Sequence, residues 1–198
     1  GVTGMGFRLG GLRVVLDFTF FAMLGVFFSL EGRGEETGHI LAALLIHELG
    51  HLAAASAVRM PMERMTFSCF GIELVRKSGV PAAWWEEALV YLAGPAVNLL
   101  CAAGFLCCGQ RFLRAGAVHL VLGVFQLLPV GALDGGCLAE TVLEHFLGPK
   151  RAELWSTALS AAVLIPLFAA GWLLLKGEGR NFTLLVCCGF LMLSIWKK

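Results

Sequence analysis

The sequence predicts an all-α membrane protein with six transmembrane helices and a short β-hairpin or re-entrant segment between the second and third helices. Hydrophobic residues make up 58% of the 198 residues and charged residues only 15%, whereas soluble domains carry about 25% charged residues. Six stretches come close to the roughly 20 apolar residues that a helix needs to cross a bilayer. They are residues 12–30, 38–58, 86–108, 115–133, 152–175 and 181–196. Little sequence remains outside them, so we expect one domain over residues 1–198.

The first stretch, residues 12–30, follows a short glycine-rich lead. It is longer than the apolar region of a signal peptide, and no clear Ala-x-Ala cleavage site follows it, so we interpret it as a retained span. Its carboxylate, Asp17, lies near the start of the stretch, where it can reach the interface or contact another helix.

The second stretch contains LLIHELGHLAAA, residues 44–55, in which ionisable side chains interrupt an apolar helix. His47 and His51 differ by about 40° in direction and about 6 Å in height on a helix, so both can reach one metal ion. Glu48 points about 100° away from His47 and is better placed to hydrogen-bond a water on that ion. This HExxH pattern predicts a Zn²⁺ site for hydrolysis, in which zinc lowers the pKa of its water to about 7 and the carboxylate takes the proton.

The alternative for these three residues is a polar cluster that holds helices together. Each ionisable group at the centre of a bilayer costs roughly 2.5–3.5 kcal/mol on insertion scales. Bound zinc contributes about 10–16 kcal/mol in small peptide sites, which is enough to offset that cost. We therefore favour the metal site over the polar cluster.

A strand pair or re-entrant hairpin is expected in residues 60–79. Here Met65, Phe67 and Cys69 alternate with polar residues, and Gly71 offers a bend. Later in the chain, residues 136–151 could hold a brief amphipathic helix at the inner membrane surface.

The third stretch has a polar break at LAGPAVNLL, residues 92–100. Pro95 frees a backbone carbonyl in the preceding turn, Gly94 permits close packing, and Asn98 brings an amide to mid-span. Helix packing explains these residues as well as a functional role does.

The fourth stretch ends in FQLLPVGALDGG, residues 125–136, whose proline and glycines must disrupt the helix. Irregular backbone at membrane depth is tolerated only where it lines protein or a watery cavity, so Asp134 predicts a wet pocket. Catalytic zinc needs a third protein ligand. The second and fourth stretches run in the same direction, which puts Asp134 at the depth of His47 and His51. The alternative is that Asp134 caps a following helix.

Other side chains are poorer candidates for the third ligand. Position near a membrane interface explains Asp17. His39 lies two turns, about 12 Å, before His47 and cannot share its ion. A helix contact explains His119, and His145 lies in an inner loop, where we expect it to be solvated.

The distribution of lysine and arginine predicts the orientation of the chain. Ten lie on one predicted side and five on the other, and the positive-inside rule then places both termini and the loop 59–85 in the cytoplasm. The first set is Arg8, Arg13, Arg59, Arg64, Arg76, Lys77, Lys150, Arg151, Lys197 and Lys198, and the second is Arg33, Arg111, Arg114, Lys176 and Arg180.

The motifs HELGH, GPAVN and LLPVGALDGG, on the second, third and fourth stretches, together resemble those of the site-2 protease family of intramembrane zinc metalloproteases. The resemblance covers nearly the whole hydrophobic chain. The chain is most similar to the compact sporulation-stage-IV type, which releases a membrane-associated pro-sigma factor. We expect neither a PDZ insertion nor the C-terminal CBS module that some members carry.

The resemblance implies a role for each matching residue. His47, His51 and Asp134 match the zinc ligands, and Glu48 matches the residue that activates water. Asn98 matches the family's asparagine in GPxxN, a structural or substrate-orienting group.

Two departures affect the predicted substrate site. Gln126 stands where the family usually has asparagine; it keeps the amide with a longer reach, so we expect it to hydrogen-bond substrate backbone. Gly131 and Ala132 replace a proline pair, which leaves the path of this loop open.

The implied function is hydrolysis of a peptide bond in or near a transmembrane or membrane-associated segment of a regulatory protein, such as a pro-sigma or anti-sigma factor. We expect the lipid bilayer and regulatory proteins as partners, no nucleic acid, and a location in a bacterial cell membrane. One alternative is a non-catalytic relative that retains client proteins, which the intact Glu48 disfavours. Another is a metal transporter, for which the other spans supply almost no ligands.

Overall fold

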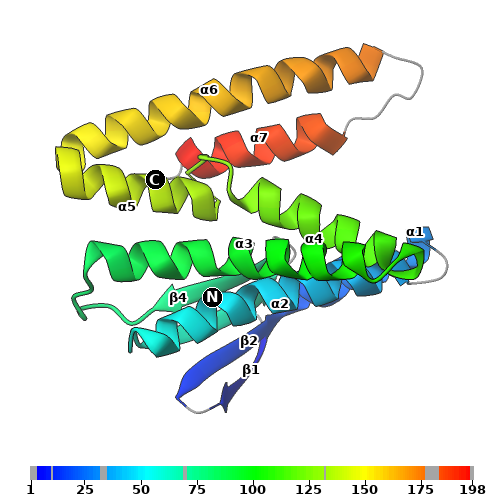
Figure 1. Cartoon of the computed structure of the whole chain (residues 1–198), viewed down its shortest axis with the longest axis horizontal. Coiled ribbons are helices and arrows are strands. Elements are labelled where there is room, and N and C mark those ends of the chain that lie inside the picture. The colour runs from blue at the N-terminus through cyan, green and yellow to red at the C-terminus, as the bar shows by residue number, and fades with distance from the viewer. Residues whose placement is uncertain are drawn as a thin grey trace. The chain divides into compact units, whose positions relative to one another are not determined.

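The computed structural model describes residues 4–9, 11–31, 35–68, 71–131, 133–176 and 183–196. The chain divides into two compact units, Gly1–Val124 and Phe125–Lys198. The described strands all belong to the first unit, whereas the second is helical (Figure 1).

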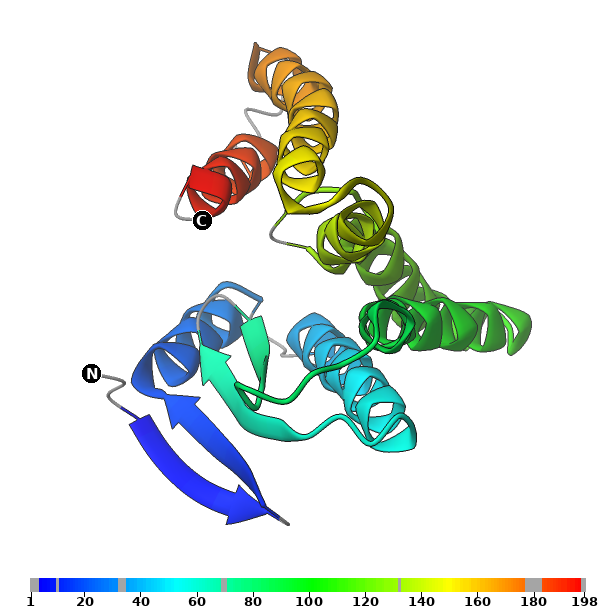
Figure 2. The same ribbon diagram turned by 90° about the vertical axis from the view of Figure 1, so that its left-hand side faces the viewer.

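The first unit combines a four-stranded sheet with long helices. The strands follow the order β1-β2-β3-β4, with antiparallel pairs β1/β2 and β3/β4 and a parallel pair β2/β3 (Figure 2). The elements are β1 (Gly4–Leu9), β2 (Leu12–Asp17), α1 (Phe18–Glu31), α2 (Glu35–Ala57), β3 (Met62–Ser68), β4 (Gly71–Arg76), α3 (Trp84–Cys107), a 3-10 turn (Gln110–Phe112) and α4 (Leu113–Gln126), which leads into the second unit.

The hairpin expected within residues 60–79 is confirmed as β3 and β4. The first predicted span, however, is wrong at its beginning, because Leu12–Asp17 forms strand β2 and helix α1 starts only at Phe18. The buried Val14 and Val15 lie beside β3 in the sheet. Pairing of these β-branched residues with a strand that comes much later in the sequence decided the conformation here.

Asp17 consequently lies at the end of a strand and not inside a membrane helix. Its Oδ1 accepts a hydrogen bond of 2.8 Å from the Thr19 N–H. This bond satisfies one of the free N–H groups in the first turn of α1, as an N-terminal capping residue does.

Helices α2 and α3 lie side by side (Figure 1), and small residues allow the close approach. A Cβ added at Gly50 would lie only 2.9 Å from the carbonyl oxygen of Ala93. Ala55, Met60 and Val90 form a buried cluster at one end of this helix pair. When two helix backbones approach this closely, side chains of one helix can hydrogen-bond directly to the other helix. Such bonds determine the geometry of the site described below.

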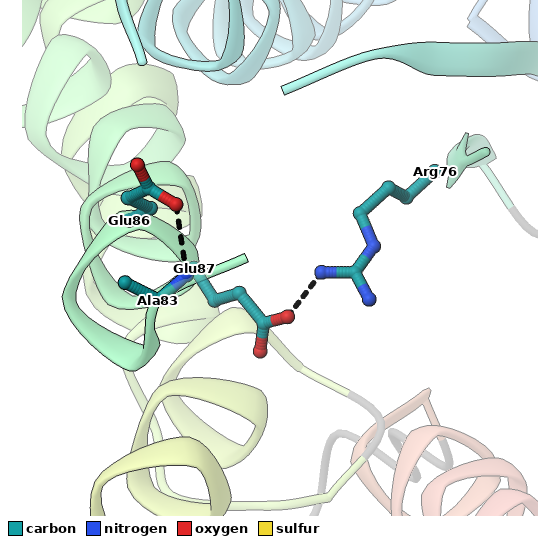
Figure 3. A network of polar contacts seen from close by, with 4 residues as sticks. All are labelled: Arg76, Ala83, Glu86 and Glu87. Carbon is teal, nitrogen blue, oxygen red and sulfur yellow. Dashed lines mark hydrogen bonds and ion pairs between the residues drawn. The ribbon is translucent and has the colours of Figure 1, made fainter. Parts of the chain in front are cut away.

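An ion pair joins the sheet to the start of α3 (Figure 3). The Arg76 guanidinium, at the end of β4, contacts the Glu87 carboxylate in the first turn of α3. Glu86 accepts a 2.8 Å hydrogen bond from the Ala83 N–H, which helps to begin the helix. The two contacts fix the point at which the chain leaves the sheet and enters α3.

The second unit contains α5 (Asp134–Leu147), α6 (Pro149–Lys176) and α7 (Thr183–Trp196). Its buried core includes Val130, Leu133, Leu164 and Leu191. The amphipathic helix expected in residues 136–151 is confirmed as α5.

The segment before α5 is irregular, as its proline and glycines predict. A Cβ at Gly135 would lie 2.1 Å from the Leu127 carbonyl oxygen, and one at Gly136 would lie 2.0 Å from that of Val130. The loop therefore folds back onto the first turn of α5 only because both positions are glycine. The Gly131 N–H also donates a 3.1 Å hydrogen bond to Ser160 Oγ. Ala132 lies outside the described residues.

Three described helices are long and apolar enough to cross a membrane, namely Glu36–Ala57, Trp84–Cys107 and Pro149–Lys176. They correspond to the second, third and fifth predicted spans, and they make the chain an integral membrane protein. Helices α1, α4 and α7 have 14 residues each, or about 21 Å, and the other three spans stay predictions.

Candidate metal centre

Helix α2 brings His47 and His51 together at one point. Both side chains are buried, and their Nε2 atoms lie 3.1 Å apart. Two nitrogens that bind one zinc at about 2.0–2.1 Å in tetrahedral geometry are about 3.3 Å apart. The spacing of four residues thus produces a pair of nitrogens whose separation suits a single ion.

Helix α3 fixes both imidazoles from the opposite side. His51 Nδ1 lies 2.6 Å from the carbonyl oxygen of Val90, so Nδ1–H donates and the Nε2 lone pair stays available. His47 Nδ1 lies 3.1 Å from the Asn98 side-chain amide. Each ring is held at Nδ1 and directs Nε2 to the shared point. Donation from Nδ1–H, as in His51, is how metal-binding histidines are usually held.

Gly94 provides the space around the paired nitrogens. A Cβ at this position would lie 2.4 Å from His51 Nε2 and 2.9 Å from His47 Cε1. Any other residue here would therefore push against both rings. The sequence GPAVN thus places a glycine where helix α3 passes the two histidines and an amide one turn later. The side chains that are present fit a metal ion.

Asp134, which the motif resemblance implies as the third ligand, belongs to the second unit. Asp134 is the first residue of α5.

Glu48 follows His47 in α2, and its side chain is only 6% exposed. A carboxylate so far from water is costly in an apolar helix unless it has a specific role or partner. The HExxH pattern predicts such a role, namely activation of water.

Four more residues considered in the sequence analysis differ in their burial and contacts. Asn98 is completely buried and contacts His47. Gln126 ends α4, and its Oε1 is buried without a hydrogen-bond partner among the described residues. His145 is exposed, and His39 lies eight residues before His47 in α2.

From its position in the sequence, His119 was expected to make only a helix contact. In the structure its Nδ1 lies 3.0 Å from Asn98 Oδ1, so it contacts the residue that holds His47. A polar residue on each of two apolar stretches is the only signal that the sequence offers for this pair. That signal does not specify which side chains meet.

No protein-family model matches the chain. A Mycobacterium tuberculosis protein named as the zinc metalloprotease Rip3 is 32% identical over 148 residues, which cover 67% of this chain and 37% of that protein. A Synechocystis protein named as zinc metalloprotease sll0528 is 29% identical over 124 residues, or 57% of this chain and 32% of that protein. The chain spans about a third of the length of these curated relatives.

Among solved structures, the chain resembles a site-2 protease from Methanocaldococcus jannaschii. The TM-score is 0.72 at 19% sequence identity, over 98% of this chain and 94% of that one. At this identity the likeness concerns the fold.

Proposed function

We propose that this chain belongs to the site-2 protease family of intramembrane zinc metalloproteases and hydrolyses a peptide bond in or near a transmembrane segment. The observation that carries this proposal is the buried pair His47 and His51, whose Nε2 atoms lie 3.1 Å apart beside the buried Glu48. These residues lie in a helix long and apolar enough to cross a membrane. The relatives named as zinc metalloproteases and the likeness in fold support the same function.

In this proposal His47 and His51 would hold zinc through Nε2, and Asp134 would provide the third ligand through a carboxylate oxygen. Bound zinc supplies a strongly polarising charge, which lowers the pKa of a coordinated water to about 7. Glu48 would act as the general base: a carboxylate oxygen accepts a proton from the attacking water as the water oxygen bonds to the scissile carbonyl carbon. It then passes this proton to the departing amine as the C–N bond breaks. Val90 and Asn98 keep the imidazole Nδ1 atoms engaged, so that the rings do not rotate.

Substrate binding must overcome the hydrogen bonding of a helical segment. A transmembrane helix hides its carbonyl groups in internal bonds, so the scissile segment has to unwind and find other partners. We propose that Gln126 provides one of them. Its buried Oε1 lacks a donor among the described residues, and an unwound substrate offers backbone N–H groups. A buried acceptor of this kind normally has a partner.

The substrate class in this proposal is a membrane protein or membrane-associated regulatory protein. The motif resemblance favours a pro-sigma or anti-sigma factor, and with it a bacterial cell membrane and a role in sporulation. The distribution of lysine and arginine favours cytoplasmic termini. Co-expression with candidate factors, followed by a search for a shortened product, tests this choice of substrate.

Zinc binding and the third ligand are tested together. The wild-type chain, purified in mild detergent, is expected to retain zinc and to cleave a co-reconstituted membrane substrate. Asp134→Asn removes an anionic ligand but preserves its shape, so we expect zinc to dissociate more readily and cleavage to fall in parallel. Chelator competition measures the affinity, and gel analysis measures the product. A wild-type chain that stays free of zinc after replenishment would contradict the proposed function, and unchanged affinity in the variant would remove Asp134 from the ligand set.

Gln126 gives a prediction about substrate binding. Gln126→Leu removes the amide, and the loss of one hydrogen bond to substrate is expected to lower kcat/KM by about tenfold. Zinc affinity should not change, and thermal stability should not fall, because the lost oxygen has no partner in the described protein. Gln126→Asn is the matched control, since it restores the amide usual in the family. Equal kcat/KM in the leucine variant and the wild type would exclude this role.

A further inference from the structure

Two buried polar residues, Asn98 and His119, are linked to His47 by hydrogen bonds. Asn98 on α3 is completely buried, and His119 on α4 is 3% exposed. The Asn98 amide lies between the two rings, with Nδ2 3.1 Å from His47 Nδ1 and Oδ1 3.0 Å from His119 Nδ1. Three helices thus contribute one side chain each to a continuous hydrogen-bonded chain that ends at a predicted metal ligand.

The direction of these hydrogen bonds follows from the chemistry of His47. In the orientation of the structure, Asn98 Nδ2 donates to His47 Nδ1, which places the ring proton on Nε2, facing His51 Nε2 at 3.1 Å. Ligation of a metal through His47 Nε2 requires the opposite arrangement, with the proton on Nδ1. That N–H then needs an acceptor, and the only acceptor of the amide is Oδ1.

A half-turn of the Asn98 amide supplies this acceptor, because it exchanges the positions of oxygen and nitrogen. Oδ1 then accepts from His47 Nδ1–H, and Nδ2 points to His119. An amide N–H in so buried a place requires an acceptor of its own. His119 Nδ1 can be that acceptor when the ring is neutral and carries its proton on Nε2.

The position of the His119 ring is itself restricted. Its centroid lies 5.5 Å from that of Phe105, and Phe105 stacks on Phe112 at 6.0 Å. The imidazole is therefore held by aromatic packing at the height of Asn98, and its Nδ1 stays within reach of either end of the amide.

We propose that His119 is a positioning residue for the metal centre: it accepts from the Asn98 amide and so lets Asn98 hold His47 in the tautomer that binds metal. This inference rests on the proposed zinc site but adds a residue to it. Histidine suits the position because it can donate or accept at Nδ1, so it satisfies both orientations of the amide. An aliphatic or phenyl side chain satisfies neither.

The test uses zinc affinity, measured in detergent by chelator competition, with the cobalt(II) absorption spectrum as a second readout. Asn98→Ala is expected to weaken zinc binding by about 10–100-fold, the usual effect of removing a partner of a ligating histidine. His119→Phe keeps an aromatic ring against Phe105 but removes the acceptor, and it should weaken binding by roughly tenfold. His119→Gln restores an acceptor and should return the affinity close to that of the wild type.

A double variant shows whether Asn98 and His119 affect zinc affinity through one hydrogen-bond network or independently. Asn98→Ala combined with His119→Phe should bind zinc as Asn98→Ala alone does, because both changes interrupt one network. His145→Phe, at an exposed histidine on α5, is the control and should bind as the wild type does. The thermal unfolding of each metal-free variant shows whether the fold is retained.

Three results would overturn the inference: full zinc affinity in His119→Phe, an equal loss in His119→Phe and His119→Gln, or additive losses in the double variant. Each leaves the zinc site of the wild type intact. A wild-type chain that binds neither zinc nor cobalt contradicts the proposed function itself, so the two failures are distinguishable.

Discussion

Replacing Glu48 with glutamine is expected to stop cleavage of a membrane substrate while zinc stays bound. Glutamine has nearly the same shape, but its neutral amide cannot accept a proton from water near pH 7. General-base catalysis contributes about 10²–10⁴-fold to rate, so kcat should fall by at least about 100-fold. Zinc content should not change, because Glu48 is not one of the three proposed ligands, His47, His51 and Asp134. Metal analysis of the purified protein and product formation in proteoliposomes measure the two quantities.

Glu153→Gln makes the same chemical change at an exposed position on α6 and serves as the control. It should cleave at the rate of the wild type. Full activity in Glu48→Gln would exclude Glu48 as the base. Loss of zinc from this variant would instead indicate that the carboxylate binds or supports the metal directly.

The second large effect, a loss of zinc affinity, is expected when one methyl group is added at Gly94. In Gly94→Ala the new Cβ would lie 2.4 Å from His51 Nε2 and 2.6 Å from His51 Cε1. The ring cannot simply move away, because its Nδ1 is bound to the Val90 carbonyl on the same helix as Gly94. We expect zinc affinity to fall by more than about 100-fold, beyond the usual effect of changes outside the ligand shell.

Gly104→Ala is the matched control for this prediction. It makes the same substitution in the same helix, but a Cβ at Gly104 meets no atom within 4 Å. Both changes favour the helix by up to about 1 kcal/mol, so a difference between them reflects the site and not helix propensity. Chelator competition gives the two zinc affinities, and circular dichroism gives the helix content. Wild-type affinity in Gly94→Ala would show that the glycine does not define the metal space.

Several features of the site could be predicted because they depend on neighbours in the sequence. The spacing of His47 and His51 specifies their common direction on any helix, and in the structure their Nε2 atoms lie 3.1 Å apart. Pro129 and the glycines after it could be expected to end the fourth helix, and α4 does end at Gln126. Such properties follow from helix periodicity and from the stereochemistry of proline and glycine.

The predicted membrane helix was wrong at its N-terminal end, where residues distant in the sequence decide the structure. Residues 12–17 are apolar enough to be read as the beginning of a membrane helix, yet they form β2 between β1 and β3. The partner strand β3 begins at Met62, beyond two complete helices. Since the pairing is stabilised by residues far away in the sequence, no pattern within 12–17 could have revealed it.

The sequence by itself determined the membrane character of the chain, the chemistry of the HExxH helix and the identity of the residues expected to hold and use a metal. Composition, helical spacing and residue type suffice for these conclusions. Only the tertiary structure decided that Gly94 leaves space for the imidazoles and that Val90 and Asn98 orient them. It also decided that His119 lies within hydrogen-bonding distance of Asn98. Hydrogen bonds act over about 3 Å, and which atoms come within that distance on separate helices is set by packing and not by spacing along the chain.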